Sequence, residues 1–316
     1  MIPAAAGDSW FLTGATASGK TGLALELARR LDGEIVSLDS MALYRGLDIG
    51  TAKPSPSERR AVPHHLIDVI EPSDEFSLAR YVEAAEASVT GIYGRGRTPI
   101  FAGGTPLYLK SLLRGIFVGP PADWKLRLKL EEAANSQPPE WLQAELAKVD
   151  PTSAQRLHAN DRRRLIRALE VFQLTGTPIS ELQQQFERSR PAEACRVFVL
   201  DWPREALYAR IDRRVDAMFA AGLVDEVRTL LARGSTFSRT AQQAVGYREV
   251  LSHLAGDLDL SATIDLVKTR TRQFAKRQLT WFRSLSECRW VQVSHESELA
   301  GAVEQITELG RKVNGE

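Results

Sequence analysis

Short apolar runs alternate with amphipathic stretches over the first 118 residues of the chain. Residues 23–31 and 77–93 repeat apolar positions at helical spacing. The runs with the length and composition of buried strands are 10–13, 34–38, 66–70 and 99–102. This alternation predicts an α/β core built on a parallel sheet.

The pattern changes after Gly119-Pro120-Pro121. Residues 122–190 are rich in Arg, Leu and Gln and lack strand-like runs, whereas strand character returns at 196–200 and 290–293. Helical patterns cover 204–233 and 260–285. We therefore expect two segments, 1–120 and 196–316, to form one α/β core, interrupted by an all-helical insertion at 121–195.

A complete G-x-x-x-x-G-K-T motif joins the first strand to the first helix. Its residues are Gly14, Ala15, Thr16, Ala17, Ser18, Gly19, Lys20 and Thr21. In such a P-loop, backbone N–H groups and the helix dipole converge on a phosphate. Lys20 is expected on the terminal phosphate and the Thr21 hydroxyl on Mg²⁺. The core is thus predicted to be P-loop NTPase-like, although the motif alone does not identify the phosphate compound.

Composition excludes several other classes. The 316 residues carry a formal net charge of only +1, so a nucleic-acid surface requires local clustering of basic residues. The two cysteines, Cys195 and Cys288, have no metal-ligand partners at suitable spacing. The chain shows neither a secretory signal pattern nor an apolar run of the roughly 20 residues that a membrane helix needs. We expect a cytoplasmic protein without a membrane partner.

Two polar residues follow predicted strands, where ligands bind in parallel α/β sheets. Asp39 follows the second strand, and Thr105 follows Gly103-Gly104 after the fourth. Each could simply cap a helix. Beside a phosphate loop, however, Asp39 could instead take a proton from a nucleophile while the loop holds the leaving group.

Two basic clusters stand out against the near-neutral total. One contains Arg156, Arg162, Arg163, Arg164 and Arg167. The other runs from Lys268 to Arg283 without an acidic residue and is interleaved with aromatic residues. Either could be a solvated helix face, but the two together favour a polyanionic partner.

Several motifs, read in order, resemble the bacterial tRNA dimethylallyltransferases. The matching segments are 14–21, 36–41, 44–54, 63–68, 76–81, 103–108, 160–164, 243–248 and 275–283. The resemblance implies transfer of a dimethylallyl group from its diphosphate to N6 of the adenosine at tRNA position 37, 3′ of the anticodon. It also implies that the partner is the tRNA anticodon stem-loop, whose adenosine is flipped into the site, and that Mg²⁺ is the cofactor.

The same resemblance implies roles for individual residues. Asp39 matches the general base, Thr105 a hydrogen-bonding group near the amine, and Lys20 and Arg214 contacts to the diphosphate held by Gly14–Thr21. The positions that match tRNA contacts are Asp39, Ser40, Met41, Ala42, Thr105, Arg127, Arg163, Arg164, Leu165, Ile166, Arg167, Gln243, Ala244, Val245, Gly246, Tyr247 and Arg248. We expect the enzyme to be a monomer.

Three alternatives share parts of this pattern. An adenylate isopentenyltransferase would use the same donor on a free nucleotide. A P-loop small-molecule kinase would keep the core but transfer a phosphoryl group. An RNA-binding module with a vestigial loop would be expected to have lost Lys20, Thr21 or Asp39, all of which are present.

Overall fold

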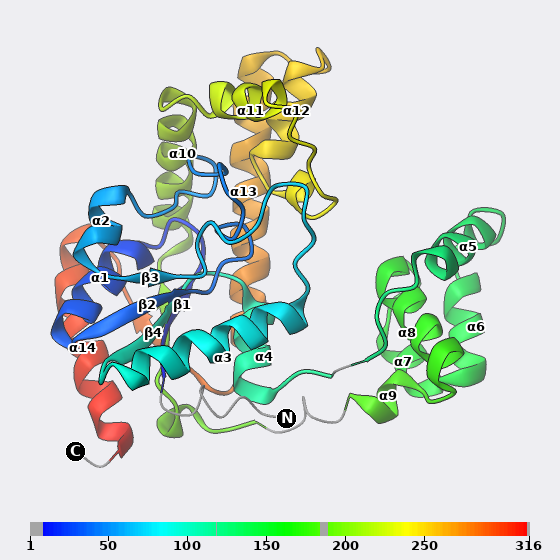
Figure 1. The fold of residues 1–316 in the computed structure, drawn as a ribbon, viewed down its shortest axis with the longest axis horizontal. Coiled ribbons are helices and arrows are strands. Elements are labelled where there is room, and N and C mark those ends of the chain that lie inside the picture. Colours follow the sequence, from blue (N-terminus) through cyan, green and yellow to red (C-terminus); the bar gives the residue numbers. More distant parts are fainter. Residues whose placement is uncertain (1–8, 118, 184–188, 315–316) are drawn as a thin grey trace. The chain divides into compact units, whose positions relative to one another are not determined.

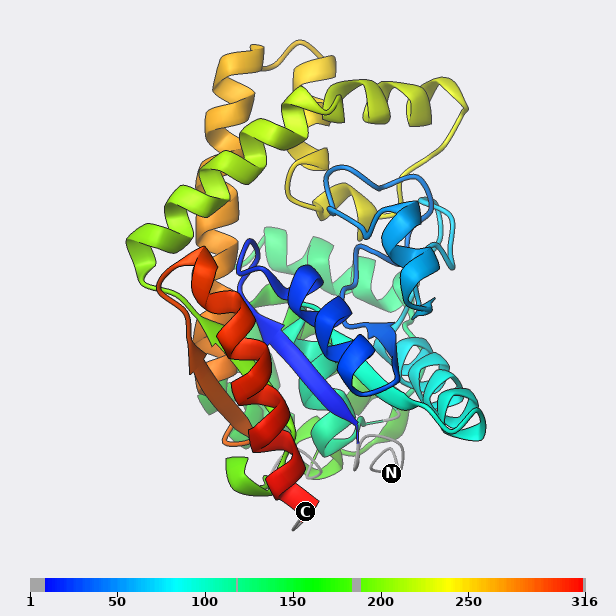
Figure 2. The ribbon, with the colours of Figure 1, turned by 90° about the vertical axis from the view of Figure 1, so that its left-hand side faces the viewer.

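The computed structural model describes residues 9–117, 119–183 and 189–314. Within them, six strands form one parallel sheet in the order β3-β2-β4-β1-β5-β6 (Figures 1 and 2). The strands are β1 Trp10–Gly14, β2 Gly33–Ser37, β3 His64–His65, β4 Thr98–Ala102, β5 Val197–Asp201 and β6 Cys288–Gln292. All five residues of β1 and of β2 are buried, as expected for a parallel sheet covered on both faces. This confirms the predicted fold class.

Helices from both ends of the chain cover this sheet. The α-helices of the two segments that contain the strands are α1 Lys20–Arg30, α2 Pro56–Ala61, α3 Leu78–Gly94, α4 Pro106–Arg114, α10 Arg204–Ala220, α11 Leu223–Ala232, α12 Tyr247–Leu254, α13 Leu260–Arg283 and α14 Leu299–Arg311. Short 3₁₀ turns occur at η3 Ala192–Ala194, η4 Ala241–Gln243, η5 Glu296–Glu298 and η6 Lys312–Asn314. Helices α1 and α14 lie side by side on one face, and α3 packs against β2 and β4 on the other (Figures 1 and 2). Helix α10 packs against α13.

The described residues divide into two compact units. Residues 9–113 and 189–314 form the unit that contains the sheet, and residues 114–183 form a helical unit. Its helices are α5 Trp124–Asn135, α6 Trp141–Val149, α7 Pro151–Arg156, α8 Arg162–Thr175 and α9 Ile179–Leu182. The helical unit thus begins a few residues before the predicted boundary at 121, and the sheet unit already includes residues 189–195.

The core of the helical unit is built from apolar residues of successive helices, including Leu142, Leu146, Leu165 and Leu169. Asp150 is buried between them, where its carboxylate accepts hydrogen bonds from the N–H groups of Ser153 and Ser180. Such capping satisfies helix N-terminal N–H groups that would otherwise be buried without a partner. The unit therefore has an interior of its own.

The predicted strand at 66–70 is wrong. The third strand is only His64–His65, and the chain then turns at Leu66 and Asp68, whose φ angles are 59° and 57°. Positive φ is incompatible with an extended strand. Asp68 is fixed by ion pairs with Lys53 at 2.5 Å and Arg59 at 2.6 Å, so polar contacts override the apolar pattern there.

The other predicted strands and the helices at 23–31 and 77–93 are confirmed within a few residues. The pattern at 204–233 is divided into α10 and α11 at Gly222, whose φ is 95°. No helix among the described residues is both long and apolar enough to cross a membrane.

Candidate active site

Three loops meet at one edge of the sheet because the strands that precede them are neighbours. Strand β1 pairs with β4, and β4 pairs with β2, so their carboxyl ends are adjacent. The P-loop follows β1, Asp39 follows β2, and Gly103-Gly104-Thr105 follows β4. This is the edge at which parallel α/β sheets bind ligands.

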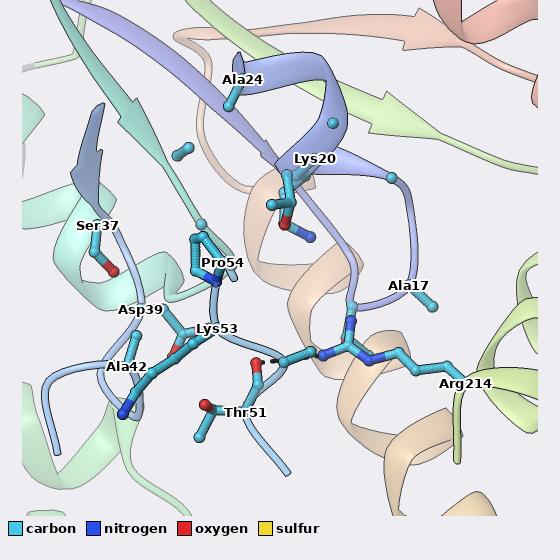
Figure 3. Close-up of a pocket in the computed structure, with 18 of the residues that line it drawn as sticks. Ala17, Lys20, Ala24, Ser37, Asp39, Ala42, Thr51, Lys53, Pro54 and Arg214 are labelled. Atoms are coloured by element: carbon cyan, nitrogen blue, oxygen red, sulfur yellow. Dashed lines mark hydrogen bonds between the residues drawn. The ribbon is translucent and has the colours of Figure 1, made fainter. Parts of the chain in front are cut away.

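A cavity of about 350 Å³ lies among these loops. The P-loop residues Thr16, Ala17, Gly19, Lys20 and Thr21 line it. Its other walls come from Asp39, the segment Thr51–Pro54, Gly103, Gly104 and residues of α10 and α13. Figure 3 shows Lys20, Asp39 and Arg214 around this cavity. The structure thereby brings the predicted phosphate site and the predicted base together.

The P-loop backbone takes conformations that few side chains allow. Gly14 has φ of 146° and Gly19 φ of 91°, and a Cβ on Gly14 would lie 3.0 Å from the Leu200 carbonyl oxygen. Ala17 also has a positive φ, 64°. Successive unusual dihedral angles of this kind form a backbone concavity for anions, with α1 behind it.

Distant side chains hold the carbonyl groups of this loop. The Trp202 indole N–H donates to the Ser18 carbonyl at 3.0 Å, and Arg210 Nε donates to the Ala17 carbonyl at 2.8 Å. The Arg210 guanidinium lies 4.3 Å over the Trp202 ring and is ion-paired with Glu296. Because these bonds fix the peptide planes, the loop is organised before any ligand binds.

Lys20 is half-buried at the start of α1. Its ammonium donates to the Ala15 carbonyl at 2.6 Å. Burial, as the main cause, and the positive charge of Arg214 lower the pKa of Lys20 to about 7, although the charge of Asp39 opposes the change. An anion bound beside Lys20 would raise this pKa again. Binding of an anionic ligand at this position would therefore favour the charged form of Lys20.

Arg214 enters the cavity from α10. Burial lowers the pKa of its guanidinium and the Asp39 charge raises it, but an arginine remains charged at neutral pH. Its Nη2 donates to the Thr51 carbonyl at 3.5 Å (Figure 3). A second cation thus faces the same space as Lys20.

Asp39 forms a local turn and also faces the cavity. Its Oδ1 accepts the Met41 N–H at 2.8 Å, which is the turn-forming role that the sequence left open. Its negative charge is close enough to raise the pKa of Tyr81 and Tyr108, after burial as the main cause. The carboxylate is therefore held in place as well as directed toward the cavity.

Thr105 connects the loops after β2 and β4. Its Oγ1 accepts the Ser40 N–H at 3.1 Å, and its own N–H donates to the Leu38 carbonyl at 3.0 Å. These two contacts flank Asp39 in the sequence. Thr105 thus supports the position of the carboxylate.

A cation site made of protein groups alone is not found here. No cluster of three or more His, Cys, Asp or Glu residues that could hold a metal occurs in the described part of the chain. Mg²⁺, however, is commonly bound by one or two protein oxygens together with substrate phosphates. The Thr21 hydroxyl, which lines the cavity, can supply such a protein oxygen beside a bound diphosphate.

Comparison with known proteins agrees with this geometry. The model of the IPP transferase family matches residues 42–285, and that of an isopentenyl transferase family matches residues 8–71. A tRNA dimethylallyltransferase of Trichlorobacter lovleyi is 52% identical over 89% of this chain and 92% of its own. The chain belongs to the IPP transferase family.

Solved structures of IPP transferases are also similar. A full-length tRNA isopentenylpyrophosphate transferase from Bacillus halodurans is 38% identical, with a TM-score of 0.69 and 98% of both chains covered. A eukaryotic dimethylallyltransferase acting on tRNA is 29% identical, with a TM-score of 0.79, covering 95% of this chain and 77% of that one. The match thus includes both units of the chain.

In the helical unit, the positions assigned to tRNA contact differ in exposure. Arg163 and Arg164 are exposed on α8, whereas Leu165 and Ile166 pack in the core. Contacts of this segment with a ligand must therefore come from the arginines or the backbone. These assignments remain predictions.

Arg127 and Arg167 are already paired with one carboxylate. Glu170 is fully buried, and Arg127 donates to both of its oxygens at 2.9 and 2.8 Å. Arg167 also pairs with Glu170 and donates to the Pro120 carbonyl at 2.9 Å. The Arg127 guanidinium lies 5.0 Å over the Trp124 ring. Both arginines are thus rigidly placed.

The segment 243–248 also mixes exposed and buried positions. Gln243 and Arg248 are exposed, and Val245 is half-buried. Ala244, Gly246 and Tyr247 are buried. The Tyr247 hydroxyl donates to Glu226 at 2.6 Å and accepts the Gly50 N–H at 3.1 Å. Tyr247 therefore holds the loop that leads to Thr51, at the cavity wall.

The basic run on α13 is partly neutralised by α10. Lys268 pairs with Asp216 at 2.7 Å and Arg272 with Asp212 at 2.6 Å. Trp202, Arg210, Gln278 and Glu296 line the cavity or hold its loops but were not among the predicted site residues. The one signal in the sequence was the position of Trp202 directly after a strand.

Proposed function

We propose that this protein transfers a dimethylallyl group from dimethylallyl diphosphate to N6 of the adenosine at position 37 of tRNA. The observation that carries the proposal is that Asp39 and the P-loop, with Lys20 and Arg214, line one cavity. A group that can accept a proton from the attacking amine and groups that can hold the leaving diphosphate therefore face the same cavity. The printed names of the relatives support the same reaction.

The chemistry requires both parts of the site. The N6 lone pair attacks the allylic carbon, the carbon–oxygen bond to the diphosphate breaks, and Asp39 accepts the proton that N6 loses. The adenine amine is a poor nucleophile because its lone pair is delocalised into the ring. Proton removal by a placed carboxylate is typically worth about 10²–10⁴-fold. The P-loop amides, Lys20 and Arg214 stabilise the charge that develops on the diphosphate.

Mg²⁺, held by Thr21 together with diphosphate oxygens, would further neutralise the leaving group. The adenosine must leave the stacked anticodon loop to reach the cavity, at a cost of a few kcal/mol that phosphate contacts can offset. Arg163 and Arg164 are exposed cations suited to such contacts. We further propose a monomeric, cytoplasmic enzyme, which size-exclusion chromatography and cell fractionation test.

Mass analysis of an anticodon stem-loop incubated with dimethylallyl diphosphate and Mg²⁺ tests the reaction. We expect one added dimethylallyl group on the adenosine 3′ of the anticodon. Parallel incubations with AMP, and with ATP plus a hydroxyl acceptor, test the two other activities. Equal turnover of AMP would favour an adenylate isopentenyltransferase, and phosphoryl transfer would favour a kinase.

A further inference from the structure

One buried side chain of α13 joins the P-loop to the loop after β4. Gln278 is only 3% exposed. Its Oε1 accepts the Thr16 N–H at 2.9 Å, and its Nε2 donates to the Gly104 carbonyl at 2.5 Å. Thr16 belongs to the loop that holds phosphate, and Gly104 precedes Thr105. A single amide thus connects two loops that belong to different strands.

The partners fix which way the amide points. A backbone N–H can only donate and a carbonyl can only accept, so the Gln278 oxygen must face Thr16 and the nitrogen must face Gly104. An apolar side chain of the same size would leave both backbone groups without these bonds. Only a side chain that both donates and accepts can replace it.

The connection continues from Gly104 to the base. Thr105 follows directly, and it bonds to Leu38 and Ser40, the residues on either side of Asp39. Hydrogen bonds and the backbone between them therefore connect the P-loop, through Gln278 and Thr105, to the two residues that flank Asp39.

The loop after β4 has little freedom to shift. A Cβ on Gly104 would lie 2.5 Å from Gln278 Nε2, and one on Gly103 would lie 2.3 Å from the Leu38 backbone. Glycine is required at both positions by close approach. The Gln278 side chain, together with the hydrogen bond from the Thr13 hydroxyl to the Gly103 carbonyl at 2.9 Å, therefore contributes to the spacing of the two loops.

We propose that Gln278 is a positioning residue that fixes the distance between the diphosphate held by the P-loop and the base Asp39. The inference rests on the proposed function, because it concerns the geometry of that reaction. A displacement of about 1 Å between reacting groups can cost about 10²-fold in rate. Gln278 lines the cavity, and its amide acts on the geometry of the site through its bonds to Thr16 and Gly104.

Gln278→Met tests the role, because methionine has nearly the same length without the hydrogen bonds. Gln273→Met is the matched control, since Gln273 is an exposed glutamine of the same helix. The measurement is the single-turnover rate constant at saturating dimethylallyl diphosphate and stem-loop. The rate constant describes the reaction of the folded molecules, whereas the amplitude of the reaction measures how many molecules are folded.

We expect at least about a 10-fold lower rate constant in Gln278→Met and a wild-type value in Gln273→Met. Combined with Thr105→Val, Gln278→Met should cost less than the product of the two single effects, because both changes interrupt one series of bonds. A lower amplitude with an unchanged rate constant would overturn the proposal in favour of a purely structural role.

If Gln278→Met does not fold, Gln278→Asn carries the test. Asparagine keeps both polar groups on a side chain one methylene shorter, so it cannot span both loops, and the rate constant should again fall. A wild-type rate constant in that variant would refute the inference. Absence of product from the wild-type protein would instead refute the proposed function.

Discussion

Binding of pyrophosphate should make Lys20 take up a proton near neutral pH. In the free protein, burial and Arg214 lower the pKa of Lys20 to about 7, from an ordinary value of 10.5. At pH 8, one unit above that pKa, roughly 90% of the Lys20 side chains are neutral. A bound diphosphate favours the charged form and raises the pKa. If the ordinary value is restored, each binding event takes up about 0.9 protons at pH 8.

The sign of the pH dependence follows from this shift. Below pH 7, Lys20 is charged before and after binding, so the affinity does not depend on its titration. As the pH rises above 7, the protein must acquire a proton in order to bind. The affinity then falls by up to about tenfold, or 1.4 kcal/mol, per pH unit until the pKa of the bound state is reached.

Isothermal titration calorimetry in buffers of different ionisation enthalpy measures this proton uptake. Lys20→Arg keeps the charge but does not titrate in this range, and Lys20→Met removes the charge. Titration of pyrophosphate itself contributes equally to all three proteins, so the difference between them isolates Lys20. Equal proton uptake and equal pH slopes in wild type and both variants would refute the reasoning.

Three further predictions concern the base, the basic cluster and the sheet. Asp39→Asn keeps an oxygen for the local turn but cannot accept the proton; we expect normal tRNA binding and at least about 10²-fold lower kcat. Arg163→Ala with Arg164→Ala should weaken stem-loop binding and reduce the slope of log affinity against log salt. Glu34 has a pKa lowered to about 2, mainly by hydrogen bonding to Arg95. It therefore stabilises the fold above its ordinary pKa of 4.5, a contribution lost as the pH falls toward 2, and Glu34→Gln should remove this pH dependence of urea unfolding.

Each of these predictions has a control. Asp257→Asn changes an exposed aspartate and should leave kcat unchanged; a near-normal kcat in Asp39→Asn would show that the base is another group. Arg233→Ala removes an exposed arginine of the sheet unit and is the control for the basic cluster. If the double variant of Arg163 and Arg164 showed the same salt slope as Arg233→Ala, the cluster would be a solvated helix face. Glu304→Gln, at an exposed glutamate, should keep the wild-type pH profile of unfolding. If Glu34→Gln also kept that profile, the ion pair of Glu34 with Arg95 would not be its cause.

Local sequence was sufficient for the elements that bury a continuous apolar run. The strands beginning at Trp10 and Thr98 and the P-loop between β1 and α1 could be predicted because neighbouring residues decide them. The run at 66–70 is apolar except for Asp68, whose ion pairs with Lys53 and Arg59 accompany a turn. Such contacts are not encoded in periodicity.

The same distinction applies to the candidate site. Asp39 and Thr105 follow strands, so topology alone brings them near the P-loop. Trp202, Arg210 and Gln278 act on that loop from almost 200 residues or more away in the sequence, as their hydrogen bonds to Ser18, Ala17 and Thr16 show. Without the packing of α10 and α13, an isolated arginine or glutamine carries no signal of this role.

The pairing of Arg127 and Arg167 with one buried glutamate has a thermodynamic consequence for anion recognition. Two positive charges and one negative charge leave a net charge of +1 at Glu170, so the cluster still attracts a phosphate. The rotamer entropy of both arginines is already lost when the helical unit folds, and a ligand therefore does not have to bear that cost on binding. Glu170 thus orients both guanidinium groups before any anion binds.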